Sequence, residues 1–506
     1  MTDTPGSTGK KTLDKDLDKI VRIEEAAGYV SRGFARPGFA ILFIAAAAVF
    51  AALYVTGEQN SALIVVAAML GGYMALNIGA NDVANNVGPA VGSKALSMVG
   101  ALVIAAVFES AGALIAGGDV VGTISKGIID PATVADSRVF IWAMMAALIS
   151  SALWVNLATV LGAPVSTTHS VVGGVMGAGI AAAGFSAVNW PTMGAIAASW
   201  VISPVLGGLI GAAFLAFIKI NIIYQDDKIA AARRWVPLLL AIMATAFAAY
   251  LAMKGLKKIV HLDGLTILTI GALAGVVTYF ATRPMIRRQS EGMENRNQSV
   301  RKLFNIPLIC SAALLSFAHG ANDVANAVGP LAAVVHTAEA GEVLAKVSIP
   351  VWVMVIGAAG ISFGLLLFGP KLIRMVGEQI TKLNPMRAYC VALSAAVTVI
   401  IASWLGLPVS STHIAVGAVF GVGFFREWYT SKSQRRRDYM DRKYQNRRPK
   451  DVKQTASANA APPEEIRRRM LVRRAHFTTI VAAWVITVPA AALLSAVTFI
   501  LLDTAF

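Results

Sequence analysis

The sequence predicts an all-α polytopic membrane protein: two inverted-topology repeats with broken helices or hairpins at the midplane. Three observations lead to this fold class. The 506 residues are 56% hydrophobic and 14% charged, whereas a soluble domain has about 25% charged residues. The apolar residues come in blocks of roughly 17–25, the length that a membrane-crossing helix needs. A motif of eleven residues occurs twice, at Gly79–Pro89 and at Gly320–Pro330.

The N-terminal segment, residues 1–37, is polar and of mixed charge. It cannot build a hydrophobic core, and it lacks the short basic start of a signal peptide. We therefore expect a cytoplasmic tail, followed by an extra transmembrane helix over residues 38–56. The cysteines Cys310 and Cys390 lie in apolar spans without a CxxC spacing, so we expect buried small hydrophobes.

The repeat extends beyond the eleven-residue motif, which agrees at ten of its eleven positions. Gly162–Gly179 is matched by Gly406–Gly423 at an offset of 244 residues, and a third pair of segments ends at Pro204 and Pro489. Three motifs in the same order indicate two related halves. The expected boundaries are a first repeat at 61–220, two linking helices at 235–283, a basic cytoplasmic linker at 284–304 and a second repeat at 305–506.

Loop charge predicts opposite orientations for the two halves. Arg426–Arg474 holds sixteen Lys or Arg against six Asp or Glu, whereas the equivalent first-half loop, Gly184–Thr192, holds no Lys or Arg. Basic loops stay on the cytoplasmic side, so we expect the loop at 426–476 inside and Gly184–Thr192 outside. The halves are then inverted repeats, a plan common among secondary transporters.

The basic residues of the loop at 426–476 could also bind another molecule. Nucleic-acid binding is not expected, because a cytoplasmic loop explains the basic residues, which can also contact anionic lipid head groups. Five crossings in each half, the two linking helices and the extra helix give about 12–13 membrane segments. The N-terminus is then cytoplasmic and the C-terminus external. Lys254–Lys258 falls outside in this scheme, against the charge rule.

Each copy of the motif places an aspartate and amides in an apolar stretch, at Asn81, Asp82, Asn322 and Asp323. A charged residue at the bilayer centre costs about 2.5–3.5 kcal/mol on insertion scales, whereas an interhelical hydrogen bond returns only about 0.6 kcal/mol. A bound cation explains the placement better, and hard oxygen ligands suit sodium, with Asp82 and Asp323 as the candidate ligands. Six flanking residues are expected to break the helices: Gly79, Gly88, Pro89, Gly320, Gly329 and Pro330.

Two runs of hydroxyl residues each follow a proline, which is typical of a helix start. Ordinary helix capping is the alternative interpretation. Three hydroxyls at matching positions of inverted halves favour an anion site instead, made by two helix N-termini that converge. The six residues are Ser166, Thr167, Thr168, Ser410, Ser411 and Thr412.

Glu109 lies in an apolar span of the first half, and the repeat places Ile361 opposite it. This unpaired carboxylate favours a role in coupling, as ion ligand or proton carrier, over a structural hydrogen bond. His169 and His413 end the hydroxyl runs. Because no second His or Cys stands at ligand spacing, we interpret them as orienting groups.

The two GANDVAN motifs, together with Val107–Asp130, resemble the inorganic phosphate transporter (PiT) family of sodium- or proton-coupled phosphate permeases. The resemblance covers Ser61–Phe506. It implies that Asp82, Asn85, Asp323 and Asn326 take part in ion and phosphate binding, and that the six hydroxyl residues ligate phosphate. It also implies a homodimer.

These observations predict a symporter in the cytoplasmic membrane that imports phosphate by alternating access, with sodium favoured over protons. No covalent chemistry and no cofactor beyond the transported ions are expected. The alternatives are a proton-coupled carrier of phosphate or metal–phosphate, a sulfate permease of the same fold, and an uncoupled anion channel. Phosphate is favoured over sulfate because a protonated phosphate suits nearby carboxylates as proton acceptors.

Overall fold

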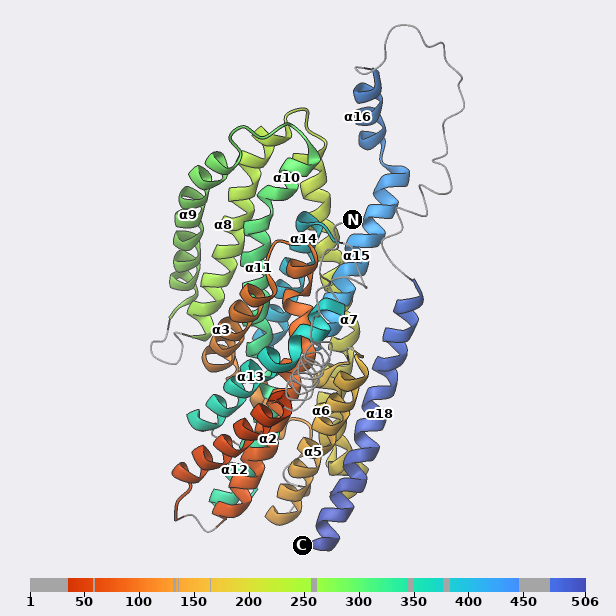
Figure 1. Ribbon diagram of the computed structural model, residues 1–506. Helices are drawn as coiled ribbons and strands as arrows, with labels where there is room; N and C mark the ends of the chain where they lie inside the picture. Colours follow the sequence, from red (N-terminus) through yellow and green to blue (C-terminus); the bar gives the residue numbers. More distant parts are fainter. Residues whose placement is uncertain are drawn as a thin grey trace, which may run out of the picture.

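The computed structural model describes residues 35–506 except 58–59, 131–132, 135, 164, 256–261, 344–348, 376–382 and 446–473. Long helices lie side by side along most of this length (Figure 1). The predicted all-α fold class is confirmed. Residues 1–34 of the expected tail, the middle of the basic loop and most of Lys254–Lys258 fall outside the described residues.

The helices follow the apolar blocks of the sequence. In chain order they are an N-terminal helix Ala35–Tyr54, α2 Ser61–Gly92, α3 Met98–Ala116, α4 Gly118–Lys126, α5 Ser137–Leu161, α6 Thr167–Ala183, α7 Trp190–Ile218, α8 Lys228–Lys254, α9 Gly264–Gln289, α10 Asn297–Leu303, α11 Asn305–Asp323, α12 Ala325–Ala340, α13 Val351–Met375, α14 Pro385–Trp404, α15 Ser411–Lys432, α16 Gln434–Gln445 and α18 Arg474–Ala505. Short 3₁₀ and π segments, η2 Phe185–Ala187 and η3 Lys219–Ile223, flank α7.

Eleven segments in the described part of the chain are long and apolar enough to cross a membrane, with α11 and α12 counted as one. The sequence predicts about 12–13 membrane segments, and the helices α6 and α15 are not among these eleven. They return from the tips of two hairpins, α5–α6 and α14–α15, whose arms pack against each other. Figure 1 shows α5–α6 in the half of the molecule that holds the C-terminus, and α14–α15 toward α16 at the other end.

Equivalent contacts recur in both halves. Helix α2 packs on α13 as α11 packs on α3, and α6 packs on α18 as α15 packs on α7. Ser110 and Ser362 are an equivalent pair, and their hydroxyls share a hydrogen bond of 2.6 Å. The structure therefore carries the internal symmetry that the repeated motifs predict.

The prediction that glycine and proline break both signature helices is wrong in detail. Helix α2 runs without a break through Pro89, and the second half is interrupted at Val324 instead. Membrane helices tolerate such residues because neighbouring groups satisfy the freed backbone atoms. Gly79 and Gly320 serve close packing, since a Cβ there would lie 1.9 Å from the Ile361 carbonyl oxygen and 2.0 Å from that of Glu109.

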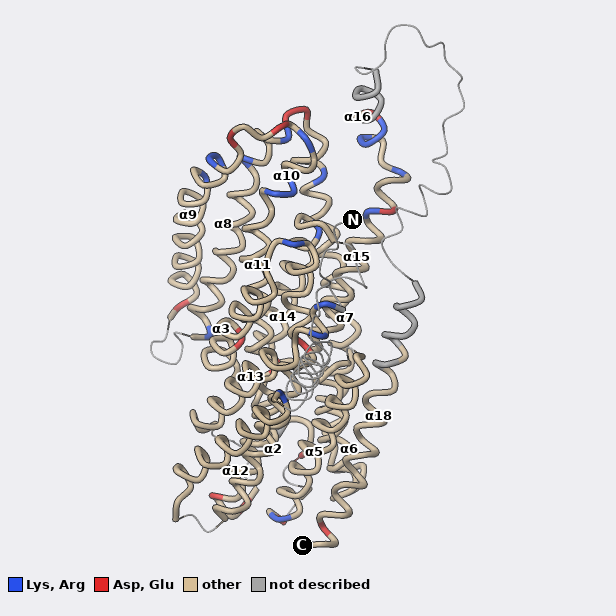
Figure 2. The backbone as a smooth tube through the Cα atoms, in the orientation of Figure 1, with Lys and Arg blue, Asp and Glu red and all other residues tan. Residues whose placement is uncertain are grey.

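Charge is distributed unevenly along the molecule. Lys and Arg gather at the end that holds α10 and α16, and far fewer lie toward the C-terminus (Figure 2). Both cysteines are free; Cys390 is buried, as expected from the sequence, whereas Cys310 is half-buried.

Candidate functional site

The two signature aspartates and the two hydroxyl runs meet in the interior. Asp82 lies on α2 and Asp323 is the last residue of α11, and their side chains are at most 1% exposed. The starts of α6 and α15 approach them from opposite hairpins. All six hydroxyl residues at these starts are buried. The site is therefore assembled from four segments, two from each repeat.

Ser166 and Ser410 are the N-caps of α6 and α15. The Oγ of Ser166 accepts from the backbone N–H of His169 at 3.1 Å, and that of Ser410 accepts from His413 at 3.3 Å. Capping, the alternative interpretation, thus holds for one residue in each run. A hydroxyl has one hydrogen and two lone pairs, so each serine can cap its helix and still donate to a ligand.

Three of the four remaining hydroxyls contact the aspartates. Thr167 donates to Asp82 Oδ2 at 2.7 Å, and Thr412 of the other repeat donates to Asp82 Oδ1 at 3.1 Å. Thr167 and Ser411 each lie 3.4 Å from Asp323 Oδ2. The runs that were predicted to bind an anion therefore stand in contact with the carboxylates that were predicted to bind a cation.

The amides Asn85 and Asn326 connect the repeats. Asn85 donates to the Thr412 hydroxyl at 2.8 Å, and Asn326 donates to the Thr168 hydroxyl at 3.2 Å. The two contacts are related by the internal symmetry. Thr168 breaks that symmetry, because its hydroxyl donates to the Val409 carbonyl at 3.0 Å and not to Asp323.

Asn81 and Asn322 hold the hairpin tips. Asn81 Nδ2 lies 3.0 Å from the Thr159 hydroxyl and 3.4 Å from the Ala163 carbonyl. Asn322 makes the equivalent bonds to Ser403 and Leu407, at 3.1 and 3.2 Å. Their amide nitrogens thus hold the ends of α5 and α14 and the turns that follow, which the sequence motif alone did not reveal.

The buried oxygens at the site that have no hydrogen-bond partner among the described residues include Asn81 Oδ1, Asp323 Oδ1 and Asn326 Oδ1. An unsatisfied buried acceptor costs about 1–3 kcal/mol, and in a native protein it calls for an ion or a water molecule. Carboxylate and amide oxygens are the ligands that hard cations prefer. The residues present therefore fit a cation.

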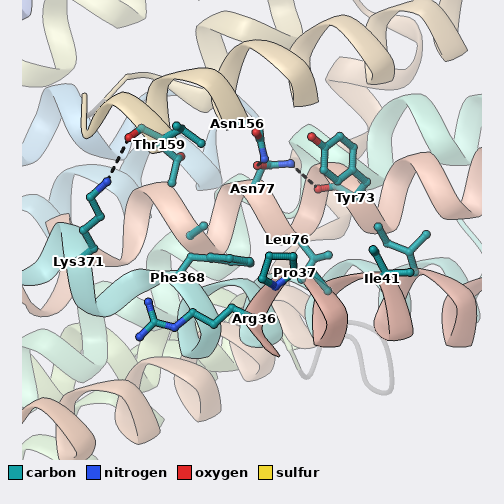
Figure 3. Close-up of a pocket in the computed structure, with 14 residues that line it drawn as sticks. Arg36, Pro37, Ile41, Tyr73, Leu76, Asn77, Asn156, Thr159, Phe368 and Lys371 are labelled. Atoms are coloured by element: carbon teal, nitrogen blue, oxygen red, sulfur yellow. Dashed lines mark hydrogen bonds between the residues drawn. The ribbon is translucent and has the colours of Figure 1, made fainter. Parts of the chain in front are cut away.

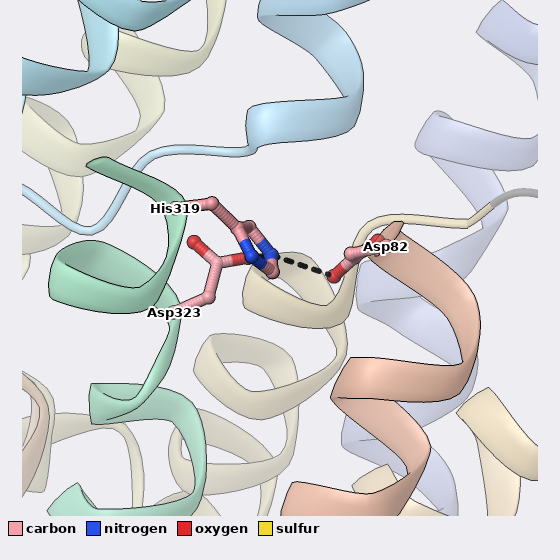
Figure 4. Close-up of side chains that lie close together, drawn as sticks. All are labelled: Asp82, His319 and Asp323. Atoms are coloured by element: carbon pink, nitrogen blue, oxygen red, sulfur yellow. Dashed lines mark ion pairs between the residues drawn. The ribbon is translucent and has the colours of Figure 1, made fainter. Parts of the chain in front are cut away.

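His319 was missed by the sequence prediction. It lies on α11, one turn before Asp323, and is fully buried. Its Nε2 is 3.2 Å from Asp323 Oδ2 and 3.8 Å from Asp82 Oδ2, and Figure 4 shows it between the two carboxylates. One feature of the sequence could have identified it: a titratable residue stands directly before the second motif, where the first half has Ile78.

Glu109 belongs to the same cluster. Its Oε2 lies 3.3 Å from His319 Nδ1, and its Oε1 accepts from Asn86 Nδ2 at 2.8 Å. A continuous polar chain thus runs from Asn86 through Glu109 and His319 to the two aspartates. One atom each of Asp82, His319 and Asp323 lie within 4.8 Å of one another, so these three side chains could also hold a metal ion.

The fold brings together His169 and His413, which lie far apart in the sequence. Their rings are 4.3 Å apart and meet edge to face, and His169 also packs on Trp200 at 3.8 Å. Each follows the hydroxyl run of its repeat in the sequence, and the orienting role expected for them stays a prediction.

Comparison with known proteins places this arrangement in context. A family model described as the phosphate transporter family matches residues 78–495. A Helicobacter pylori protein named "Putative phosphate permease" is 46% identical and aligns with 96% of this chain and 98% of its own length. A Haemophilus influenzae protein of the same name is 35% identical over 74% of this chain and 90% of its own. The solved structure of "The sodium-dependent phosphate transporter" superposes with a TM-score of 0.75 at 34% identity, covering 88% of this chain and all of that one.

Proposed function

The chain belongs to the phosphate transporter family, and from this premise we propose that it imports inorganic phosphate across the cytoplasmic membrane by sodium symport. One observation carries the proposal. The starts of two helices from opposite repeats meet at two buried carboxylates, so groups suited to an anion and to a cation share one interior site.

Phosphate would bind at the helix starts. Backbone N–H groups and the positive ends of α6 and α15 favour an anion, and hydroxyls and amides supply further donors. The hydroxyls that now donate to Asp82 and Asp323 would turn to the phosphate oxygens. The proposed ligands are Ser166, Thr167, Thr168, Ser410, Ser411, Thr412, Asn85 and Asn326.

Sodium would bind between the aspartates and the phosphate. A phosphate dianion beside Asp82 and Asp323 is repelled unless cations lie between them. The unsatisfied oxygens of Asn81 and Asn326 add neutral ligands beside the carboxylates, and Asn322 stands at the equivalent position. The printed name of the superposing structure, a sodium-dependent transporter, supports the choice of ion.

Energetics favour more than one cation in each cycle. Each unit of negative charge that enters a cell with an inside-negative potential is opposed by about 2.3 kcal/mol per 100 mV. Cotransported cations must outnumber those charges if phosphate is to be concentrated. The inverted repeats offer one aspartate each, and rocking of one repeat against the other would expose the site to each side in turn.

A second candidate is a proton-coupled carrier of a metal–phosphate complex. The cluster of Asp82, His319 and Asp323 favours it, because an imidazole is a common ligand of transition metals and a poor one for sodium. His319 and Glu109 could also pass a proton along the polar chain. In the sodium mechanism the same two residues set the charge that surrounds Asp323.

The orientation and assembly follow from the sequence predictions. We propose repeats at 61–220 and 305–506, linking helices at 235–283 and a basic linker at 284–304. The N-terminus is cytoplasmic and the C-terminus external. The family resemblance supports a homodimer, and the gathering of Lys and Arg at one end suits contact with anionic lipids on the cytoplasmic side (Figure 2).

Competition in proteoliposomes tests the substrate and the coupling. Labelled phosphate uptake should be driven by an imposed sodium gradient and blocked by excess unlabelled phosphate but not by sulfate. Ionophores that collapse the sodium and proton gradients should remove accumulation. Uptake that sulfate blocks equally would assign a sulfate permease, and flux that persists unchanged without either gradient would assign a channel.

A further inference from the structure

A cavity of about 470 Å³ lies between the N-terminal helix, α2, α5 and α13. Figure 3 shows Arg36 of the N-terminal helix and Lys371 of α13 at this cavity, with Asn77, Asn156 and Thr159 on the adjoining helices. None of these five residues is among the proposed phosphate or sodium ligands. The cavity is large enough for a phosphate ion together with water.

The cavity adjoins the substrate site. Thr159 lines it, and the hydroxyl of Thr159 accepts from Asn81 of the first signature motif at 3.0 Å. Asn156 and Asn77 continue the polar surface, and Asn156 Nδ2 donates to Asn77 Oδ1 at 3.1 Å. A path of polar groups therefore leads from the cavity to the tip of the α5–α6 hairpin.

Two cationic side chains line this space, and no Asp or Glu is among its lining residues. Lys371 is exposed, and its Nζ donates to the Val160 carbonyl at the C-terminal end of α5, at 3.1 Å. Arg36 is also exposed. Cations in a cleft with low-dielectric walls raise the local concentration of anions.

At the symmetry-related place of the other repeat, the described residues differ from those that line the cavity. The repeat offsets pair five lining residues with mostly apolar ones: Leu76 with Phe317, Asn77 with Ala318, Asn156 with Ile400, Phe368 with Ala116 and Lys371 with Asp119. There, Ala116 and Phe317 form a buried cluster with Tyr250 of α8, and Phe247 and Ile400 pack on it.

Aromatic side chains from α8 fill that position. The rings of Phe247 and Tyr250 meet the ring of Phe317 edge to face, at 5.1 and 6.3 Å. Tyr250 is 2% exposed. Lys254 at the end of α8 forms an ion pair with Asp119, so the positive charge of Lys254 is balanced by a carboxylate.

We propose that the cavity is an anion vestibule through which phosphate passes between the buried site and the cytoplasm, and that the aromatic cluster on α8 closes the opposite route in this conformation. The cytoplasmic assignment follows from Arg36, which lies at the start of the helix that leaves the predicted cytoplasmic tail. The proposal rests on the proposed function. It gives the extra N-terminal helix a part in transport.

The two mirror positions provide a matched test. Asn156→Cys and Ile400→Cys would be compared in a background with Cys310→Ala and Cys390→Ala. An impermeant anionic methanethiosulfonate added to inside-out vesicles should label Asn156→Cys at least about 10-fold faster than Ile400→Cys, because Asn156 lines the vestibule, where anions are concentrated, whereas Ile400 packs on the aromatic cluster. Equal labelling of the two, or labelling of Asn156→Cys only from the external side, would overturn the proposal.

Charge variants test whether the vestibule selects anions. The ratio of anionic to cationic reagent rates at Asn156→Cys should fall several-fold in Arg36→Gln and in Lys371→Gln, and Lys371→Arg should restore it. Millimolar inorganic phosphate should slow the anionic reagent. A ratio that stays unchanged in both Gln variants would contradict an anion vestibule.

A lipid head group offers the same phosphate chemistry and must be distinguished. Labelling would be repeated in vesicles of phosphatidylcholine alone and with added phosphatidylglycerol. The same anionic preference in both supports inorganic phosphate, whereas loss of labelling only with the anionic lipid would make the cavity a head-group site and overturn the proposal. Labelling does not depend on transport, so normal labelling without phosphate uptake would instead contradict the proposed function alone.

Discussion

Asp82 and Asp323 occupy equivalent positions in the two repeats, and their surroundings differ. Asp82 accepts short hydrogen bonds from one hydroxyl of each repeat, at 2.7 and 3.1 Å. Asp323 has only 3.4 Å hydroxyl contacts and lies 3.2 Å from the His319 imidazole. One aspartate is therefore held by the helix starts of both repeats, and the other is held by a titratable group.

Three departures from the repeat explain this difference. Asn86, Glu109 and His319 stand where the other half has Ala327, Ile361 and Ile78. All three polar residues lie in one chain that reaches the aspartates. The residues common to both repeats thus supply the shared substrate site. Asn86, Glu109 and His319 have no polar counterpart in the other repeat. We propose that the residues common to both repeats bind phosphate and the coupled cation, and that the chain of Asn86, Glu109 and His319 sets the charge around Asp323.

Removal of either aspartate charge should have the largest effect. Asp82→Asn and Asp323→Asn keep the side-chain shape and remove the charge that offsets cation desolvation. Loss of one partner of a buried charge pair costs about 3–5 kcal/mol, so sodium-driven uptake should fall by roughly 100-fold or more. Normal uptake by either variant, at matched protein levels, would show that this aspartate holds no coupled cation.

Alanine at either of the two equivalent glycines should destabilise the fold to a similar extent. Gly79→Ala and Gly320→Ala would each place a Cβ about 2 Å from a backbone oxygen of the facing helix, and such overpacking costs about 1–3 kcal/mol or more. Both variants should lower the melting temperature in detergent. Gly122→Ala is the control, because nothing lies within 4 Å of its Cβ. A lowered melting temperature in only one of the two variants would contradict equivalent close packing at the two glycines.

Alanine substitution of Thr412 and of Thr168 should weaken phosphate binding to different extents. Both alanine variants should raise the phosphate KM, since a hydrogen bond to a charged group is worth about 1.5–3 kcal/mol, or roughly 10- to 150-fold. Thr412→Ala should have the larger effect, because Thr412 contacts Asp82 whereas Thr168 donates to a backbone carbonyl. If both variants transport normally, the runs are helix caps alone.

The smallest effect should come from making the two motifs identical. Asn86→Ala removes the hydrogen bond to Glu109 and should slow turnover by about 10-fold, the lower end for a charged partner, with KM for phosphate little changed. Glu109→Gln should slow turnover while sodium dependence remains. The double variant should be no slower than Glu109→Gln, and fully additive losses would separate Asn86 from the polar chain.

Much of this arrangement could be predicted from the sequence, because repeated polar motifs in apolar helices have few physical explanations. The apolar blocks gave the helices, and the motif pair identified Asp82 and Asp323. Three-dimensional facts could not be read in this way. The role of Asn81 at a hairpin tip depends on an amide direction, and His319 became relevant only when α11 placed it between three carboxylates. The glycines of the motif were misread as helix breakers because close packing of α2 on α13 leaves no periodic signal.

A sodium gradient and a proton gradient, applied separately to the unmodified protein, test sodium coupling most directly. Labelled phosphate uptake into proteoliposomes would be measured with an inward sodium gradient at equal pH, and with an acid-outside gradient in sodium-free buffer. Sodium alone should drive accumulation above equilibrium, and the acid gradient alone should not. Robust sodium-free, acid-driven uptake would contradict sodium coupling, make Glu109 and His319 the proton carriers, and leave the phosphate assignment standing.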